Sequence, residues 1–197
     1  MKVVLASRNR HKVREIQGLF DGVGVTLVTI DELAPDAELR EDEDTFEANA
    51  LAKARQAAAA TGLPAIADDS GIEVDALDGA PGVRSARFAG EPCDDARNNH
   101  KLLQSLAGVP TPRRTARYRC AAVFVDPARG FELVRMGACE GVVLESPRGS
   151  GGFGYDPLVL LPALGRTMAE IPFDEKNRLS HRAVAFRALA DALRAHG

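Results

Sequence analysis

Two adjacent aspartates are the residues of this sequence that most clearly suggest chemistry. Asp68 and Asp69 follow a short apolar run, 65–67, and precede Ser70 and Gly71. We expect the run to be a strand that ends at these acids, where two carboxylates are costly to bury without a partner. Mg²⁺ is one such partner, because it takes one or two carboxylates together with water and phosphate oxygens. The alternative is a turn in which an aspartate caps the following segment.

An acidic run lies upstream of the two aspartates. It spans Glu41 to Asp44, and Glu41 is a candidate for a second metal ligand. A carboxylate beside a metal ion can orient or deprotonate a water molecule, so the pattern predicts metal-assisted hydrolysis. A charge run is also the ordinary composition of a solvated surface, and the sequence leaves both interpretations open.

A basic turn follows the first apolar run of the chain. It reads Ser7-Arg8-Asn9-Arg10-His11-Lys12. Backbone N–H groups at a helix N-terminus, together with cationic side chains, form a cradle for anions such as phosphate. The Gly-x-x-x-x-Gly-Lys-Ser/Thr pattern of a P-loop is absent. A solvated basic turn is the alternative.

A glycine-rich segment late in the chain combines aromatic and acidic residues. It reads Gly151-Gly152-Phe153-Gly154-Tyr155-Asp156-Pro157. Glycines let a backbone approach a ligand closely, an aromatic ring can stack on a base, and an aspartate can accept from ring N–H groups. The segment therefore predicts a pocket for a nucleotide base, although a β-bulge or tight loop has similar composition.

A last group of donors precedes the C-terminal segment. Lys176 and the run Ser180-His181-Arg182 lie near the expected start of the last helix. Donors at a helix N-terminus suit an anion or a carbonyl oxygen. Ser180 as a helix cap with two exposed neighbours is the alternative.

The N-terminal elements expected to position these groups alternate between strand and helix. A strand over 2–6, a helix with its apolar face formed by residues from Val13 to Phe20, and a strand over 25–30 make a βαβ-like opening. An alanine-rich helix is expected over 45–61, with Asp44 as its cap.

The C-terminal half adds a hairpin and a final helix. Strands over 115–125 and 131–144 are joined by a short polar turn, which predicts an antiparallel pair. The last helix is expected to turn Val184 and Leu189 inward. Helices alternating with a mixed sheet predict an α/β fold. With no repeat or linker, residues 1–197 read as a single domain.

Composition narrows the functional class. The chain of 197 residues is 45% hydrophobic and 27% charged, as expected of a globular protein, and its net charge of −3 gives no field that attracts a nucleic acid polymer. Cys93, Cys120 and Cys139 lack metal-ligand spacing and read as thiols of a reducing compartment. The first apolar run is too short for a signal peptide or membrane helix. We therefore expect a cytoplasmic protein without membrane contact.

Taken together, these segments resemble the inosine triphosphate pyrophosphatase family, also called XTP/dITP diphosphatases. The resemblance runs from Lys2 to about Ala192 and is carried by Asp-Asp-Ser-Gly, by Gly-Gly-Phe-Gly-Tyr-Asp-Pro, and by Glu-Lys-Asn ahead of Ser-His-Arg. It implies Mg²⁺-dependent hydrolysis of non-standard purine nucleoside triphosphates to the monophosphate and pyrophosphate. It also implies an elongated mixed β-sheet with flanking helices, two lobes around a central cleft, and a homodimer.

The resemblance further implies a role for each motif. Asp69 would be the catalytic base and a Mg²⁺ ligand, Asp68 its support, and Glu41 the second metal ligand. The basic turn would bind the triphosphate, with Asn9 and Lys12 as main contacts and with Ser7, Arg8, Arg10 and His11. Ser70 would touch the substrate. The purine would be surrounded by Phe153, Gly154, Tyr155, Asp156, Lys176, His181 and Arg182.

Selectivity and two departures from the family pattern complete the interpretation. A donor from Arg182 or His181 aimed at the 6-keto oxygen would favour hypoxanthine and xanthine over adenine.

Arg8 stands where the family commonly has glycine, and a positive φ there would strain it. Ala48 precedes Asn49 where a glutamate is common.

Two other functions fit parts of the sequence. A metal-dependent phosphomonoesterase usually has Asp-x-Asp after its first strand, whereas this strand leads into Ala6-Ser7. A non-catalytic nucleotide-binding protein would leave the adjacent Asp68 and Asp69 without a purpose.

Overall fold

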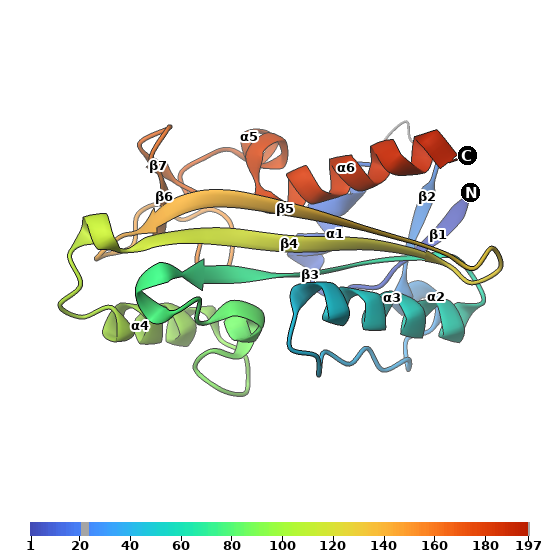
Figure 1. Ribbon diagram of the computed structural model, residues 1–197, viewed down its shortest axis with the longest axis horizontal. Coiled ribbons are helices and arrows are strands. Elements are labelled where there is room, and N and C mark those ends of the chain that lie inside the picture. The colour runs from blue at the N-terminus through green and yellow to red at the C-terminus, as the bar shows by residue number, and fades with distance from the viewer. Residues whose placement is uncertain (21–23, 197) are drawn as a thin grey trace. The chain divides into compact units, whose positions relative to one another are not determined.

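The chain has an α/β fold built on one mixed sheet. The computed structural model describes residues 1–20 and 24–196. Its seven strands follow the order β2-β1-β3-β4-β5-β6-β7 and are flanked by helices (Figure 1). The predicted fold class, a mixed β-sheet with flanking helices, is confirmed.

The chain forms two compact units, which we describe separately. Unit 1 comprises Met1–Asp69, Cys120–Gly137 and His181–Gly197, and unit 2 comprises Ser70–Arg119 and Ala138–Ser180. Strands β3, β4 and β5 contribute residues to both units. Each unit has its own apolar core.

Unit 1 opens with the predicted βαβ arrangement. Strand β1 (Lys2–Leu5) leads through the basic turn into α1 (Arg10–Gln17), and β2 (Thr26–Thr29) returns parallel to β1. The helix ends earlier than its apolar pattern predicted. Leu19 and Phe20 therefore lie beyond α1, although Phe20 is still buried in the core of unit 1.

Two helices follow in unit 1. The four-residue α2 (Ile30–Leu33) was not predicted, whereas α3 (Phe46–Thr61) has the expected bounds. The predicted cap of α3, Asp44, is wrong: the hydroxyl of Thr45 accepts the helix N–H at 3.1 Å. Gly62 ends the helix with a φ of 68°, a conformation in which glycine meets no Cβ penalty.

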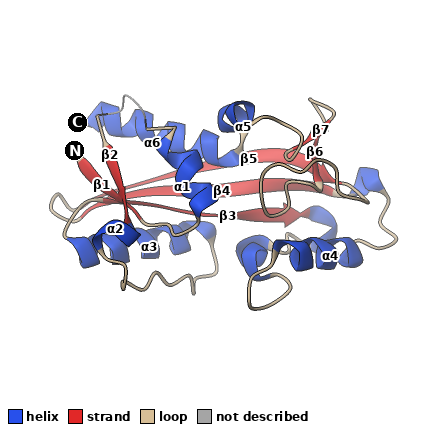
Figure 2. Cartoon of the chain, turned by 180° about the vertical axis from the view of Figure 1, so that it is seen from behind, coloured by secondary structure: helices blue, strands red, loops and turns tan. Residues whose placement is uncertain are grey.

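The last helix, α6 (His181–His196), covers one face of the unit 1 strands, and α3 covers the other (Figures 1 and 2). It lies so close to β5 that a Cβ at Gly137 would be 2.1 Å from the carbonyl oxygen of His181. Its inward face differs from the prediction, because Val184 is 42% exposed. The buried apolar residues of α6 are Ala183, Ala185, Phe186, Leu189 and Ala190.

Strand β3 is longer than the sequence suggested. It runs without a break from Ala65 to Val74, so Asp68 and Asp69 lie inside a ten-residue strand rather than at its end. Adjacent Asp, Ser and Gly have low strand propensity, which favoured a turn. Position between β1 and β4 overrides that preference. Gly71 is required here, because a Cβ would meet the hydroxyl oxygen of Ser85 at 2.3 Å.

The predicted hairpin is present. Strands β4 (Thr115–Asp126) and β5 (Phe131–Val143) are neighbours joined by residues 127–130, and so short a connection requires antiparallel strands. Strand β6 (Val159–Leu161) pairs antiparallel with β5, and β7 (Arg166–Thr167) pairs antiparallel with β6.

Unit 2 contains two α-helices. Helix α4 (Asp95–Ser105) is capped by the carboxylate of Asp94, which accepts a helix N–H at 2.7 Å. Helix α5 (Phe173–Leu179) was not predicted, and it carries Lys176. Short 3₁₀ turns complete the unit: η1 (Asp75–Leu77), η2 (Gly82–Arg87) and η3 (Thr111–Arg113). Within residues 1–20 and 24–196, no helix has the length and apolar character needed to cross a membrane.

Candidate active site

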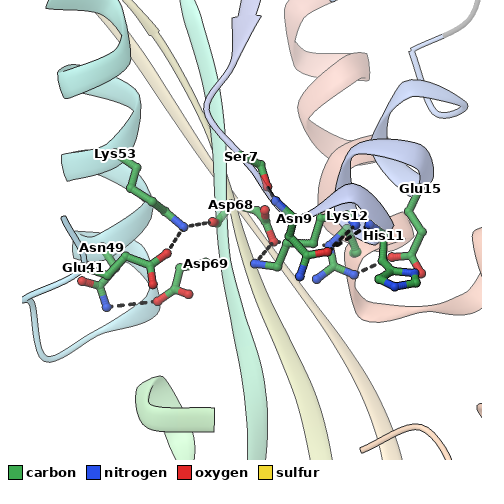
Figure 3. Close-up of polar contacts among 11 residues, drawn as sticks. Ser7, Asn9, His11, Lys12, Glu15, Glu41, Asn49, Lys53, Asp68 and Asp69 are labelled. Atoms are coloured by element: carbon green, nitrogen blue, oxygen red, sulfur yellow. Dashed lines mark hydrogen bonds and ion pairs between the residues drawn. The ribbon is translucent and has the colours of Figure 1, made fainter. Parts of the chain in front are cut away.

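Asp68 is buried among cations in unit 1. Its side chain is 1% exposed, and its Oδ2 lies 3.0 Å from the Nζ of Lys12 and 3.3 Å from the Nε of Arg182 (Figure 3). The Nζ of Lys53 donates to its backbone carbonyl at 2.5 Å. Burial favours the neutral acid, but the three cations outweigh it and hold the pKa of Asp68 well below its ordinary value. Asp68 is therefore a fixed negative charge.

Asp69 has the opposite character. Successive side chains of a strand point to opposite faces, so Asp69 faces away from Lys12 and toward α3. There its Oδ2 accepts a hydrogen bond of 3.0 Å from the amide of Asn49 (Figure 3). Burial raises the pKa of Asp69, and this effect outweighs the opposing influence of Lys53 and Lys12. A carboxylate with a raised pKa is suited to accept a proton.

Helix α3 connects Asp69 to the acidic segment. The ammonium group of Lys53 contacts both Oε1 of Glu41 and the carbonyl of Asp68 (Figure 3). The amide of Asn49 bonds to the backbone N–H and carbonyl of Glu43 at 2.9 and 3.2 Å. Burial lowers the pKa of Lys53, but the nearby carboxylates of Asp68, Glu41 and Asp69 raise it by more. Lys53 therefore keeps its charge.

Neither Lys53 nor Asn49 was among the predicted site residues, although Asn49 was noted as part of the family pattern. A signal was present, since the two residues are four positions apart on an alanine-rich helix and therefore share one face. Both are buried, and a lysine buried on an apolar face requires carboxylate partners. Here those partners are Glu41 and the two aspartates of β3.

The basic turn lies at the start of α1, as predicted. The side-chain oxygen of Asn9 caps the helix by accepting the N–H groups of His11 and Lys12 at 3.0 and 3.2 Å. The hydroxyl of Ser7, which is buried, accepts the N–H of Asn9 at 3.3 Å. Arg10 and His11 are exposed. The structure thus brings Ser7, Asn9 and Lys12 close to Asp68 (Figure 3).

Arg8 points away from this group. Its guanidinium donates to Oδ1 of Asp31 at 2.7 Å and to the carbonyls of Pro35 and Ala37 at 2.7 and 2.8 Å. The backbone of Arg8 is also unstrained. Among residues 1–20 and 24–196, Asp78 is the one non-glycine residue with a positive φ. The departure from glycine at position 8 therefore causes no backbone strain.

His181 and Arg182 lie in unit 1. Arg182 is 2% exposed, and its Nη1 donates to Oε2 of Glu15 on α1 at 2.5 Å while its Nε faces Asp68. The resemblance implied a role for both residues at the purine. Arg182 has two carboxylate partners here, as a guanidinium this deeply buried requires. The role of His181 and Arg182 at the purine stays a prediction.

Unit 2 contains a second polar cluster, centred on Asp156. Its carboxylate accepts the ammonium of Lys176 at 2.6 Å, the N–H of Phe153 at 2.9 Å and the hydroxyl of Tyr118 at 3.1 Å. The Nζ of Lys176 also lies 4.7 Å from the ring centroid of Phe153. A Cβ at Gly152 would be 2.0 Å from Oδ2 of Asp156, so this position requires glycine.

The loop of this cluster is fixed from α4. Oδ2 of Asp95 accepts the N–H of Gly154 at 2.6 Å, and Nδ2 of Asn99 donates to the carbonyl of Gly154 at 2.9 Å. The hydroxyl of Tyr155 donates to the carbonyl of Ser85 at 2.8 Å, and the ring is buried. The sequence did not identify Asp95, Asn99 or Tyr118, which lie outside the glycine-rich motif.

The predicted site residues are divided between the two units, and in each unit some of them form a polar cluster. In unit 1 they are Ser7, Arg8, Asn9, Arg10, His11, Lys12, Glu41, Asp68, Asp69, His181 and Arg182. In unit 2 they are Ser70, Phe153, Gly154, Tyr155, Asp156 and Lys176. The first cluster is dense in charge, and the second combines one ion pair with neutral donors and aromatic rings.

The unit 1 cluster fits a hard cation in the chemistry of its donors. Asp69 and Glu41 offer oxygen ligands, which Mg²⁺ prefers. Oδ1 of Asp68 is buried and has no hydrogen-bond partner. Among residues 1–20 and 24–196 there is no group of three or more His, Cys, Asp or Glu side chains that could hold a metal ion. The protein would therefore supply few ligands, as is usual where Mg²⁺ is shared with a phosphate.

The sequence matches the Ham1 family over residues 3–192. It is 52% identical over 196 residues to the dITP/XTP pyrophosphatase of Methylococcus capsulatus, covering 98% of this chain and 96% of the relative. The protein of the same name from Geobacter sulfurreducens is 50% identical over 192 residues, with the same coverage of 98% and 96%.

Solved structures of Ham1 proteins are similar in fold to this chain. The Staphylococcus aureus Ham1 protein superposes with a TM-score of 0.90 at 36% identity and covers 100% of both chains. A HAM1 protein from Coxiella burnetii gives a TM-score of 0.91 at 38% identity and covers 99% of both chains.

Proposed function

The chain belongs to the Ham1 family, and on this premise we propose that it hydrolyses non-standard purine nucleoside triphosphates to the monophosphate and pyrophosphate. ITP, dITP and XTP are the proposed substrates. The observation that carries the proposal is the pair Asp68 and Asp69, two adjacent buried carboxylates of which the first is held by cations and the second by the amide of Asn49. Adjacent acids with different protonation behaviour suit water activation beside an anionic substrate.

The triphosphate is assigned to the basic turn of unit 1. Lys12 is the best placed cation, since its ammonium group is held by Asp68 at the start of α1. The N-terminus of that helix adds a favourable field for phosphate oxygens. Ser7 and Asn9 hold the turn in shape, while Arg10 and His11 are exposed and can approach the outer phosphates.

Asp69 is assigned the role of general base. Its proton-accepting oxygen is oriented by the amide of Asn49, and burial raises its pKa toward the range in which a base is effective. Asp68 holds Lys12 and Arg182 in place as a constant negative charge. In this assignment Asp69 accepts the proton and Asp68 positions the cations, so the two acids have separate roles.

Asp69 and Glu41 are the residues that would hold Mg²⁺. A bound Mg²⁺ would neutralise charge on the leaving pyrophosphate. Lys53 supports the same pair, because its ammonium group contacts Glu41 and lies close enough to Asp69 to influence its pKa. Helix α3 therefore helps to hold both carboxylates.

The purine is assigned to the unit 2 cluster. Phe153 offers a ring for stacking, Asp156 an acceptor, and Lys176 a donor. Lys176, which lies in this cluster beside Phe153, joins His181 and Arg182 as a candidate donor to the 6-keto oxygen. A 6-amino group would leave that donor unpaired, at a cost of about 1–3 kcal/mol.

Product identification tests the proposed function. The chain is incubated with ITP and Mg²⁺, and both pyrophosphate and orthophosphate are measured. Release of pyrophosphate with IMP supports the proposal. Orthophosphate as the first product would indicate the phosphomonoesterase, and binding without turnover would indicate the nucleotide-binding protein.

We also propose a homodimer, from the family resemblance, and a cytoplasmic location, from the cysteine pattern and the short first apolar run. Light scattering on the purified protein tests the first of these. A mass of one chain at micromolar concentration would contradict it.

A further inference from the structure

The acidic loop, residues 34–45, joins α2 to α3 and carries Glu41. These residues form no helix or strand of their own. A segment without regular structure keeps its shape only through side-chain and turn contacts. The position of Glu41 therefore depends on whatever anchors this loop.

The second half of the acidic loop is anchored by α3. The N–H of Arg40 donates to Oε1 of Gln56 at 2.7 Å. Glu41 contacts the ammonium of Lys53, and the amide of Asn49 pairs with both backbone groups of Glu43. Three successive turns of one helix thus fix this half.

The first half is anchored by Arg8 of the basic turn. One guanidinium reaches Asp31 just before the loop and the carbonyls of Pro35 and Ala37 within it, at 2.7 to 2.8 Å. A planar guanidinium can serve several acceptors at once, which an ammonium group on a flexible stem does less well. Its Nε and Nη2 are occupied by these acceptors.

We propose that Arg8 is a positioning residue that holds the acidic loop against the basic turn, so that Glu41 stands ready beside Lys53 for metal binding. The metal part of this inference rests on the proposed function, in which Glu41 is a Mg²⁺ ligand. Arg8 lies in the turn assigned to the triphosphate, yet it acts on the neighbouring loop and does not bind phosphate. One side chain thereby connects the two segments.

Hydrogen exchange of the full chain tests the anchoring without reference to activity. Arg8→Ala is expected to speed exchange of the amides of residues 34–45 by roughly fivefold or more, since losing one net hydrogen bond shifts an opening equilibrium by about that factor. Arg8→Lys and Asp31→Ala should give smaller increases, because each retains part of the contact set. Unchanged exchange in Arg8→Ala would overturn the proposal.

Arg55→Ala is the matched control. Arg55 also lies in unit 1, is exposed, and forms two hydrogen bonds of 2.7 and 2.8 Å with Glu132. Its replacement removes the same charge and a comparable ion pair, whose partner Glu132 belongs to β5 and not to the loop. Exchange in residues 34–45 should equal that of the wild type.

Magnesium titration tests the functional part. Arg8→Ala should raise the Mg²⁺ concentration for half-maximal pyrophosphate release from ITP by roughly fivefold, with kcat at saturating Mg²⁺ little changed. Affinity for ITP in excess EDTA should stay at the wild-type value. A loss of metal-free ITP affinity with unchanged loop exchange would show that Arg8 binds phosphate directly, against the proposal. If the wild type releases no pyrophosphate, the proposed function fails, while the exchange series still decides the anchoring.

Discussion

The two units hold their buried carboxylates in different ways. In unit 1, Asp68 faces three cations and retains one oxygen without a hydrogen bond. In unit 2, Asp156 has one cation, Lys176, and takes its remaining contacts from neutral donors. The first arrangement suits a highly charged ligand, whereas the second suits an uncharged ring with specific donors and acceptors. In our proposal the same residue type thus serves two kinds of recognition.

The largest effect is expected at Asp69. Asp69→Asn removes the proposed base but keeps the shape of the side chain and its contact with Asn49. Turnover of ITP should fall by about 10²–10⁴-fold, the usual contribution of general base catalysis. ITP affinity measured without turnover should change little. Activity equal to the wild type would remove Asp69 from the reaction.

Asp68 should matter mainly for stability. Asp68→Ala leaves Lys12 and Arg182 without their shared carboxylate in a buried position. Removing one partner of a buried ion pair typically costs roughly 3–5 kcal/mol in the free energy of unfolding. Urea denaturation measures this, with Glu38→Ala on the exposed surface as control. A loss below that of the control would contradict a structural role for Asp68.

Tyr118→Phe probes the unit 2 cluster with a smaller change. It removes only the hydroxyl that donates to Asp156. A hydrogen bond to a charged group is worth about 1.5–3 kcal/mol, so KM for ITP should rise while kcat is largely kept. A fall in kcat at unchanged KM would instead connect Tyr118 to the chemical step.

The smallest effect is expected at Asn99. Asn99→Ala removes the donor to the carbonyl of Gly154 and should raise KM for ITP by a factor corresponding to about 1 kcal/mol. Gln104→Ala on the exposed side of the same helix is the control. Equal KM values for the two variants would show that the Asn99 contact does not fix the loop.

Local sequence signals predicted much of the fold. The βαβ opening, the α3 helix with Gly62 at its end, and the hairpin of β4 and β5 each follow from periodicity and turn residues close in sequence. The break expected after residues 65–67 was wrong because local propensity favoured a turn, while neighbouring strands on both sides stabilise a continuous β3.

The sequence supplied the motifs of the candidate site but not the partners of their side chains. Arg182 and Glu15 pair across 167 positions of sequence, a contact that no local pattern encodes. The opposite pKa shifts of Asp68 and Asp69 follow from the alternation of a strand, which could be inferred only once β3 was known to continue through both residues.

Competition by inorganic tripolyphosphate tests most directly whether unit 1 binds the phosphates and unit 2 the base. Tripolyphosphate has no purine, and its inhibition constant against ITP hydrolysis is compared in Lys12→Met and Phe153→Leu. We predict that Lys12→Met weakens both tripolyphosphate and ITP, whereas Phe153→Leu leaves tripolyphosphate unchanged and raises KM for ITP, since stacking contributes about 1–3 kcal/mol per base. Weaker tripolyphosphate binding in Phe153→Leu, or unchanged binding in Lys12→Met, would contradict the assignment of the two clusters.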